Sequence, residues 1–237
     1  MHRSPAQPYV YSLLRTFSRL IGVTFYRLRC EGREHWPAVG GGLVCSNHQS
    51  FFDPNLIGMT CPRQMNYLAR DTLFKVPVLR EAMTFLDAIP IDREGSGLAG
   101  LKETMKRLKA GELVLIFPEG TRTHNGDLSP LKPGFCSIAR RSRVPLIPVG
   151  MDGAYQAWPR TSPLPMPGKL AVVIGHPISA EDVASMGDEV LIAELESRMR
   201  ACHLEAQRIR EGCFVDPLLL EGLKAGELAP TEHERHG

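Results

Sequence analysis

The run Leu113 to Phe117 (LVLIF) consists of five consecutive apolar residues between Gly111 and Pro118. A short run of this kind with turn residues on both sides predicts a buried strand rather than a helix. A strand that is apolar at every position must be covered on both faces, as the central strands of parallel sheets are. We therefore expect an α/β domain built around a covered sheet.

Along the rest of the chain, predicted strands alternate with predicted helices. The run Gly42 to Ser46 (GLVCS) predicts a second buried strand, and apolar residues at helical spacing predict a helix over 98–108 that stops at Gly111. Further strands are expected at 65–69, 86–91, 144–149 and 170–174, and further helices at 53–59, 134–143 and 180–211, the last beginning with the capping box of Ser179 and Asp182. The pattern predicts a single α/β domain with a largely parallel or mixed central sheet flanked by helices.

Composition narrows the range of functions. The net charge is only +2, from 28 Lys and Arg against 26 Asp and Glu in 237 residues, which argues against a nucleic-acid partner and means that any anion site must be local. The six cysteines include no C-x-x-C pair, and the eight histidines do not cluster as ligands. We expect free thiols, no metal site and no cofactor.

The segment from Tyr9 to Arg29 mixes aromatic and aliphatic residues with four arginines and contains no acid. It has no signal-peptide pattern, and no apolar run approaches the roughly 20 residues that a membrane-spanning helix needs. Two interpretations remain open. The segment is either a basic amphipathic helix at a membrane surface, or a helix that packs on the domain with its arginines in solvent.

Polar residues follow the strand at 42–46. His48 stands at the strand end, and Asp53 stands at the predicted N-cap of the next helix with Pro54 at the first helical position. A tight turn between them brings the carboxylate to one ring nitrogen and leaves the other exposed, as a general base for a hydroxyl requires. The alternative is a structural loop histidine beside a helix cap.

Cations follow two other strands. Arg122 ends the turn Glu119-Gly120-Thr121-Arg122 after the strand at 113–117, and Arg93 follows the strand at 86–91. Ligands of open α/β sheets gather at the carboxyl ends of the strands, so these clusters are expected to meet at one edge and to bind a phosphate. The alternative is that both arginines form ion pairs with nearby acids.

Four blocks of sequence together resemble the glycerolipid acyltransferases, of the bacterial 1-acylglycerol-3-phosphate (lysophosphatidic acid) acyltransferase type. They stand in the order and approximate spacing of that family: Asn47-His48-Gln49-Ser50 through Asp53, Ile91-Asp92-Arg93, Phe117-Pro118-Glu119-Gly120-Thr121-Arg122, and Val144 to Val149. Four ordered blocks are far more specific than any single motif.

The resemblance implies roles for individual residues. His48 would be the general base on the acceptor hydroxyl, and Asp53 would orient it. The acceptor's phosphate would be bound by residues of the second and third blocks together with Arg70, namely Arg70, Arg93, Glu119, Gly120, Thr121 and Arg122. Arg70 stands where the family commonly has lysine, and 144–149 would be a buried strand shaping the acyl site.

The resemblance also sets the expected reaction and location. An acyl group would pass from acyl-CoA or acyl-carrier protein to a hydroxyl of a membrane lipid acceptor, such as 1-acylglycerol 3-phosphate or another lysophospholipid or lyso-aminolipid. We expect a docking segment at 1–29, an acyltransferase domain at 30–215 and a tail at 216–237, with the protein peripheral on the cytoplasmic face of the inner membrane. An acyl-thioester hydrolase and a non-catalytic lipid-binding module are the alternatives.

Overall fold

The computed structural model describes residues 7–75, 77, 80–81, 88–91, 97–159, 161–162 and 164–212. Its strands are β1 (Arg29–Glu31), β2 (Gly42–Ser46), β3 (Met65–Arg70), β4 (Ile89–Ile91), β5 (Leu113–Ile116), β6 (Leu146–Asp152) and β7 (Ala171–Ile174). Its α-helices are α1 (Gln7–Tyr26), α2 (Asp53–Thr60), α4 (Leu98–Lys109), α5 (Gly134–Ser142), α6 (Ala154–Ala157), α7 (Ala180–Ser185) and α8 (Asp188–Glu211). Two short 3-10 helices, η1 (Arg33–His35) and η2 (Asp71–Lys75), complete the described elements.

The strands form one sheet in the order β1-β7-β6-β2-β5-β3-β4. Every neighbouring pair is parallel except β6 and β7, which are antiparallel. The predicted α/β class with a mixed sheet is confirmed. The central strands β2, β5 and β6 are buried along their whole length, as their largely apolar sequences require.

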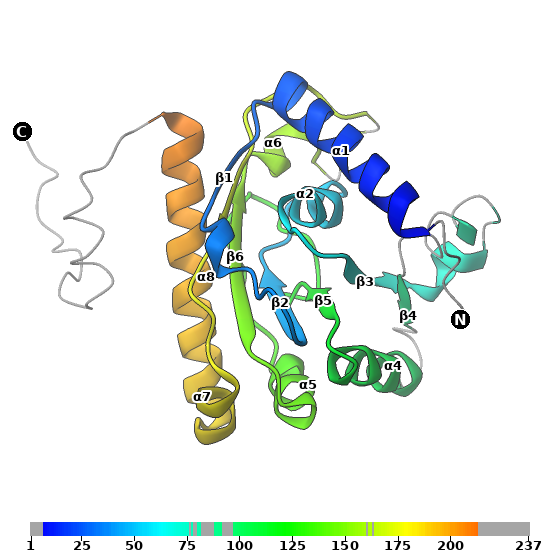
Figure 1. Ribbon diagram of the computed structural model, residues 1–237. Helices are drawn as coiled ribbons and strands as arrows, with labels where there is room; N and C mark the ends of the chain where they lie inside the picture. The colour runs from blue at the N-terminus through cyan, green and yellow to red at the C-terminus, as the bar shows by residue number, and fades with distance from the viewer. Residues whose placement is uncertain are drawn as a thin grey trace, which may run out of the picture.

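Successive residues of the strands point to opposite faces of the sheet and pack into two separate hydrophobic cores. Leu43 and Cys45 of β2 pack with apolar residues of α4, α5, α7 and α8, whereas Val44 packs on the opposite face with residues of α2 and α6. Figure 1 shows α8 running along one side of the sheet, and α1 lying across α2. The structure is therefore a three-layer arrangement with helices on both faces of the sheet.

Helix α1 differs from a typical surface helix, because its arginines face the domain and its large apolar side chains face outward. Its side chains at Arg15, Arg19, Gly22 and Tyr26 are half-buried or buried, at the spacing of one helix face. The opposite face exposes large apolar side chains, which are Phe17, Leu20, Ile21, Val23 and Phe25. In the described residues, no helix is long and apolar enough to cross a membrane.

The arginines of α1 bind the end of α2. Arg15 donates from Nη1 to the carbonyl oxygens of Cys61 and Pro62, at 3.0 and 2.8 Å, and Arg19 donates to the carbonyl of Met59. Carbonyls at a helix C-terminus lack intrahelical donors and carry the negative end of the helix dipole, so cations stabilise them. The helix packs on the domain, but Arg15 and Arg19 bind carbonyls at the end of α2 and do not lie free in solvent, whereas Arg27 and Arg29 are exposed. The interpretation as a membrane-surface helix stays a prediction.

Two further predictions need correction. The single helix expected over 180–211 is two helices, because the chain is extended at Met186, whose side chain packs against the core between α7 and α8. The strand expected at 144–149 is β6, which begins at Leu146, because Arg143 adopts a left-handed conformation that ends α5 and Val144 still belongs to that turn. The predicted capping box is confirmed, since Ser179 Oγ accepts a hydrogen bond from the Asp182 amide at 3.0 Å.

Candidate active site

His48 lies two residues beyond the end of β2, in the loop that leads to α2. Its Nδ1 is 2.6 Å from Oδ2 of Asp53, and the imidazole ring is about one-fifth exposed whereas Asp53 is fully buried. A carboxylate accepts a hydrogen bond from an N–H group, so we assign the imidazole proton to Nδ1. The lone pair of Nε2 is then available for a hydroxyl proton, because no described residue forms a hydrogen bond with Nε2.

The carboxylate of Asp53 accepts hydrogen bonds from the loop between β2 and α2. Its Oδ2 accepts hydrogen bonds from the amides of Gln49 and Ser50, at 2.6 and 2.8 Å, as well as from His48. The predicted N-cap assignment is wrong, because Phe52 occupies the cap and Asp53 is the first residue of α2. As the first helical residue, Asp53 folds its side chain back over the preceding loop. Burial raises the pKa of its carboxyl, and the hydrogen bonds from His48, Ser50 and Gln49 partly oppose that rise.

Two contacts fix the orientation of the imidazole. Its ring stacks on the ring of Phe117, with centroids 3.8 Å apart and planes 11° from parallel. Phe117 follows β5, the strand next to β2, so the stack spans two neighbouring strand ends. With one face covered by Phe117 and Nδ1 bound to Asp53, rotation of the ring is restricted.

Glu119 joins the loops that follow β2 and β5. Its Oε1 accepts from the amide of His48 at 2.6 Å and its Oε2 accepts from the amide of Ser129 at 2.8 Å, while the amide of Thr123 donates to the carbonyl of His48 at 2.8 Å. Burial raises the pKa of the Glu119 carboxyl, which these amides partly oppose. Both oxygens already accept from the backbone, so the contact of Glu119 with a substrate stays a prediction.

The rest of the turn faces outward beside the His48 loop. Gly120 has a φ of +76°, which favours glycine, and a side chain there would meet Nζ of Lys132 at 2.9 Å. Thr121 is exposed, and the guanidinium carbon of Arg122 lies 3.7 Å from the ring centroid of Phe51. The predicted meeting of the first and third blocks at one sheet edge is confirmed, and Lys132 is a nearby cation that the sequence reasoning missed.

The other predicted cations lie outside this description. Arg93 and its neighbour Asp92 fall outside the described residues. Arg70 ends β3, and its side chain also lies outside what the structure describes. Their predicted roles in phosphate binding stay predictions.

The other polar residues of the first block bind the segment around the end of β6. Both amide atoms of Asn47 bond to the backbone of Met151 at 2.9 Å, and Gln49 accepts from the amide of Tyr155 at 3.2 Å. The Ser50 hydroxyl donates to the carbonyl of Trp158 at 2.9 Å. These positioning contacts were not predicted, because pairing between segments about a hundred residues apart leaves no local signal.

Chemical options at the site are limited by these contacts. The amides of residues 48–50 and of Gly120 are not free to stabilise an oxyanion, because they donate to Asp53, Glu119 and the carbonyl of Phe117. Across the described ranges, no group of three or more His, Cys, Asp or Glu side chains is arranged to hold a metal ion. The arrangement offers an oriented general base at Nε2 with a cation, Arg122, in the neighbouring turn.

The sequence matches the family model described as Acyltransferase over residues 27–152, more than half of the chain. It is also 32% identical over 185 residues to the 1-acyl-sn-glycerol-3-phosphate acyltransferase of Bacillus subtilis, covering 78% of this chain and 87% of that protein. The chain belongs to the acyltransferase family. The resemblance expected from the four blocks is confirmed, and it favours an acyltransferase over a thioester hydrolase or a binding module.

Other members of the acyltransferase family agree. The 1-acyl-sn-glycerol-3-phosphate acyltransferase of Pseudomonas aeruginosa is 34% identical over 163 residues, which cover 67% of this chain and 61% of that protein. The crystal structure of the 1-acyl-sn-glycerophosphate acyltransferase PlsC of Thermotoga maritima superposes with a TM-score of 0.75 at 27% identity, covering 87% of this chain and 84% of that one. The similarity therefore extends from the His48 block through most of the sheet and its flanking helices.

Proposed function

We propose that this protein transfers a fatty acyl group from a thioester donor, acyl-CoA or acyl-carrier protein, to the free hydroxyl of 1-acylglycerol 3-phosphate. The observation that carries the proposal is the 2.6 Å contact between His48 and a fully buried Asp53, which leaves Nε2 of the imidazole as the available base. The relatives named above act, by their names, on 1-acyl-sn-glycerol 3-phosphate.

The proposed reaction has two steps. Nε2 of His48 takes the proton of the acceptor hydroxyl as its oxygen attacks the thioester carbonyl, giving a tetrahedral oxyanion. The intermediate collapses by breaking the carbon–sulfur bond, and the imidazolium returns the proton to the departing thiolate. Asp53 keeps the proton of Nδ1 in place and stabilises the transient imidazolium. Because a thioester is already activated, positioning and one base suffice without a covalent enzyme intermediate.

In this proposal, the acceptor's phosphate lies near the turn after β5. Arg122 supplies a fork of donors that matches phosphate oxygens, and its stacking on Phe51 holds it next to the His48 loop. Gly120 and Thr121 provide backbone at the same turn, and Arg70 and Arg93 are proposed as further cations. A phosphorylated acceptor is thereby bound with its hydroxyl toward the imidazole.

The activity is tested by following thiol release and lipid product with oleoyl-CoA and a panel of acceptors. The panel holds glycerol 3-phosphate, 1-acylglycerol 3-phosphate and other lysolipids. We expect thiol release that requires 1-acylglycerol 3-phosphate, equals product formation and falls at least about 1,000-fold in His48→Ala, as when a base is removed from a catalytic unit. His35→Ala, a histidine on η1, is the matched control. Thiol release without acceptor, or full activity in His48→Ala, would contradict the mechanism.

We also propose that α1 attaches the protein peripherally to the cytoplasmic face of the inner membrane. The support is its exposed apolar face, where Phe17, Leu20, Val23 and Phe25 are each 58–63% exposed. Several large apolar side chains exposed on one helix mark an interaction surface, and the proposed substrate is itself a membrane lipid.

Vesicle flotation tests the attachment. The double variant Leu20→Ser and Val23→Ser should bind zwitterionic vesicles about 100-fold more weakly, because each buried side chain contributes about tenfold. Val39→Ser is the matched control, since Val39 is 83% exposed but belongs to the loop before β2 and not to α1. Unchanged binding of the double variant would show that another surface attaches the protein.

A further inference from the structure

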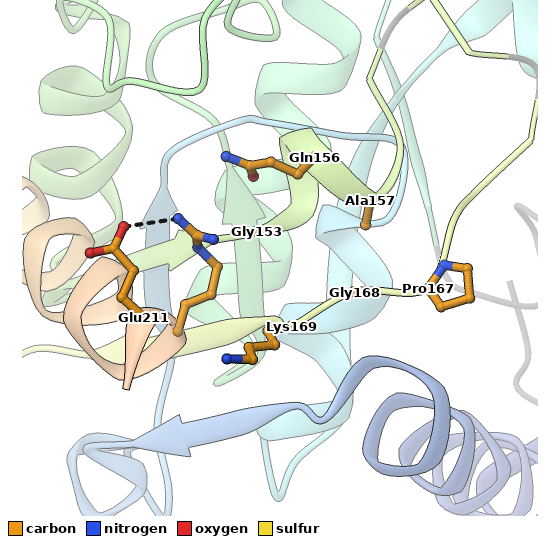
Figure 2. Close-up of a pocket in the computed structure, with 8 residues that line it drawn as sticks. Gly153, Gln156, Ala157, Pro167, Gly168, Lys169 and Glu211 are labelled. Atoms are coloured by element: carbon orange, nitrogen blue, oxygen red, sulfur yellow. Dashed lines mark hydrogen bonds and ion pairs between the residues drawn. The ribbon is translucent and has the colours of Figure 1, made fainter. Parts of the chain in front are cut away.

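We propose that a pocket between the end of α1, the start of β7 and the end of α8 binds the phosphate of an anionic membrane phospholipid. The inference rests on the proposed membrane attachment of α1. Two adjoining hollows of 450 and 140 Å³ share Lys169 and Arg210 in their walls. Figure 2 shows Lys169 and Glu211 on neighbouring sides of the larger hollow, with Gln156 across from them.

Backbone pairing brings the cations of this pocket together. The amide of Leu170 donates to the carbonyl of Tyr26 and the amide of Arg29 donates to the carbonyl of Leu170, both at 3.0 Å. These bonds set Arg27 and Arg29 beside Lys169, and all three line the smaller hollow. The three side chains are exposed, and no described acid forms an ion pair with any of them. Arg27 has a φ of +43°, an uncommon conformation for a residue with a side chain.

A fourth cation, Arg210, offsets one of the two acids at the pocket. Arg210 forms an ion pair with the buried carboxylate of Asp152 and contacts Glu211 at 3.1 Å. The negative end of the α8 dipole also faces this region, since the helix ends at Glu211. The three other cations, Arg27, Arg29 and Lys169, outnumber the remaining acid and the helix terminus, so the pocket has a net positive charge that suits a phosphate.

The surroundings of the pocket favour a lipid as the source of that phosphate. Phe25, two residues before Arg27, is 60% exposed, and Leu164 and Met166, shortly before Lys169, are 71% and 65% exposed. Cations next to exposed apolar side chains in two neighbouring segments suit a bilayer interface, where apolar groups enter the acyl region and cations meet phosphates. The pocket therefore lies where α1 would bring it to the level of the head groups.

Vesicle binding of the full chain tests the proposal. Flotation is measured with phosphatidylcholine vesicles, with and without anionic phosphatidylglycerol. The variant Arg29→Gln with Lys169→Gln should lose about fivefold per residue in affinity for the anionic vesicles and nothing for the neutral ones. The matched control, Lys102→Gln with Lys106→Gln on α4, should bind as the unmodified protein does. Thermal unfolding of each variant shows that it is folded.

Two outcomes would overturn the proposal. Equal loss in the pocket and control variants would reduce the effect to net charge. The proposal also fails if the pocket variant keeps its preference for anionic vesicles. In that case, a raised KM for acyl-CoA would show that the cations bind the donor's phosphates, and a lower melting temperature would show that they only stabilise the end of α8. His48→Ala is expected to keep full vesicle binding, so a failure of the proposed chemistry is seen separately.

Discussion

The carboxylate of Asp53 is fully buried and its Oδ2 accepts three hydrogen bonds, yet burial still raises its pKa. A folded-state pKa above the unfolded value means that the native protein binds this proton more tightly. Stability contributed by the protonated form is therefore present below the ordinary carboxyl pKa of about 4 and is lost as the pH rises toward the raised value. Ionised Asp53 is retained at neutral pH at a cost in stability.

Asp53→Asn should separate stability from chemistry. The amide carries no charge, so we expect a melting temperature at neutral pH equal to or above that of the unmodified protein, with the difference shrinking as the pH falls toward about 4. The Asn side-chain oxygen can take the place of Oδ2 and keep its three hydrogen bonds. Activity should fall at least about 100-fold, because a neutral amide does not stabilise the imidazolium that forms when Nε2 takes the proton. Calorimetry and acyl-transfer assays across pH check both. Asp71→Asn, on exposed η2, is the control, and a variant that is active or strongly destabilised would contradict the account.

At the scale of elements, the site is two loops joined by one buried side chain. Glu119 accepts from the His48 amide on one oxygen and from the Ser129 amide on the other. Glu119→Gln keeps the shape but replaces one acceptor by a donor that faces a backbone N–H. We expect a loss of about 1–3 kcal/mol in the free energy of unfolding, measured by urea titration, and a lower kcat as the His48 loop shifts. Glu196→Gln, in a surface pair on α8, should change neither value.

The elements that were predicted correctly are those with a strong local pattern of apolar residues. The largely apolar strands β2 and β5 and the amphipathic helix α4 were located to within a residue or two. The strand β1 was missed because it is three residues long and carries Arg29 and Glu31. The antiparallel direction of β7 was not predicted either, since direction depends on the path of the connection and leaves no mark in a four-residue apolar run.

The candidate site was also predicted only in part. The His48 and Asp53 pair and its proximity to the turn after β5 followed from motif position at strand ends, which the sheet then brings together. The function of Glu119 as a link and the bonds of Asn47 and Gln49 to the segment around the end of β6 were not predicted. Side chains that bond to distant backbone have no periodicity or spacing from which their partners follow.

For the whole molecule, the two surfaces proposed to meet a membrane, the apolar face of α1 and the cationic pocket, should respond differently to salt. Binding through the exposed face of α1 is hydrophobic, so affinity for zwitterionic vesicles should stay constant up to about 1 M salt. The additional affinity for anionic vesicles should disappear over the same range, because charges are screened over about 3 Å there. Flotation at several salt concentrations distinguishes the two, and release from zwitterionic vesicles by salt would contradict the role of α1.

The inward direction of Arg15 and Arg19 also determines how the protein behaves away from lipid. Both guanidinium groups are committed to the carbonyls at the end of α2, so α1 has no charge to mask Phe17, Leu20 and Phe25 in water. Without detergent, these side chains should drive concentration-dependent self-association. Because they are exposed rather than packed in the core, polar replacements there offer a route to a monodisperse preparation with its catalytic loops intact.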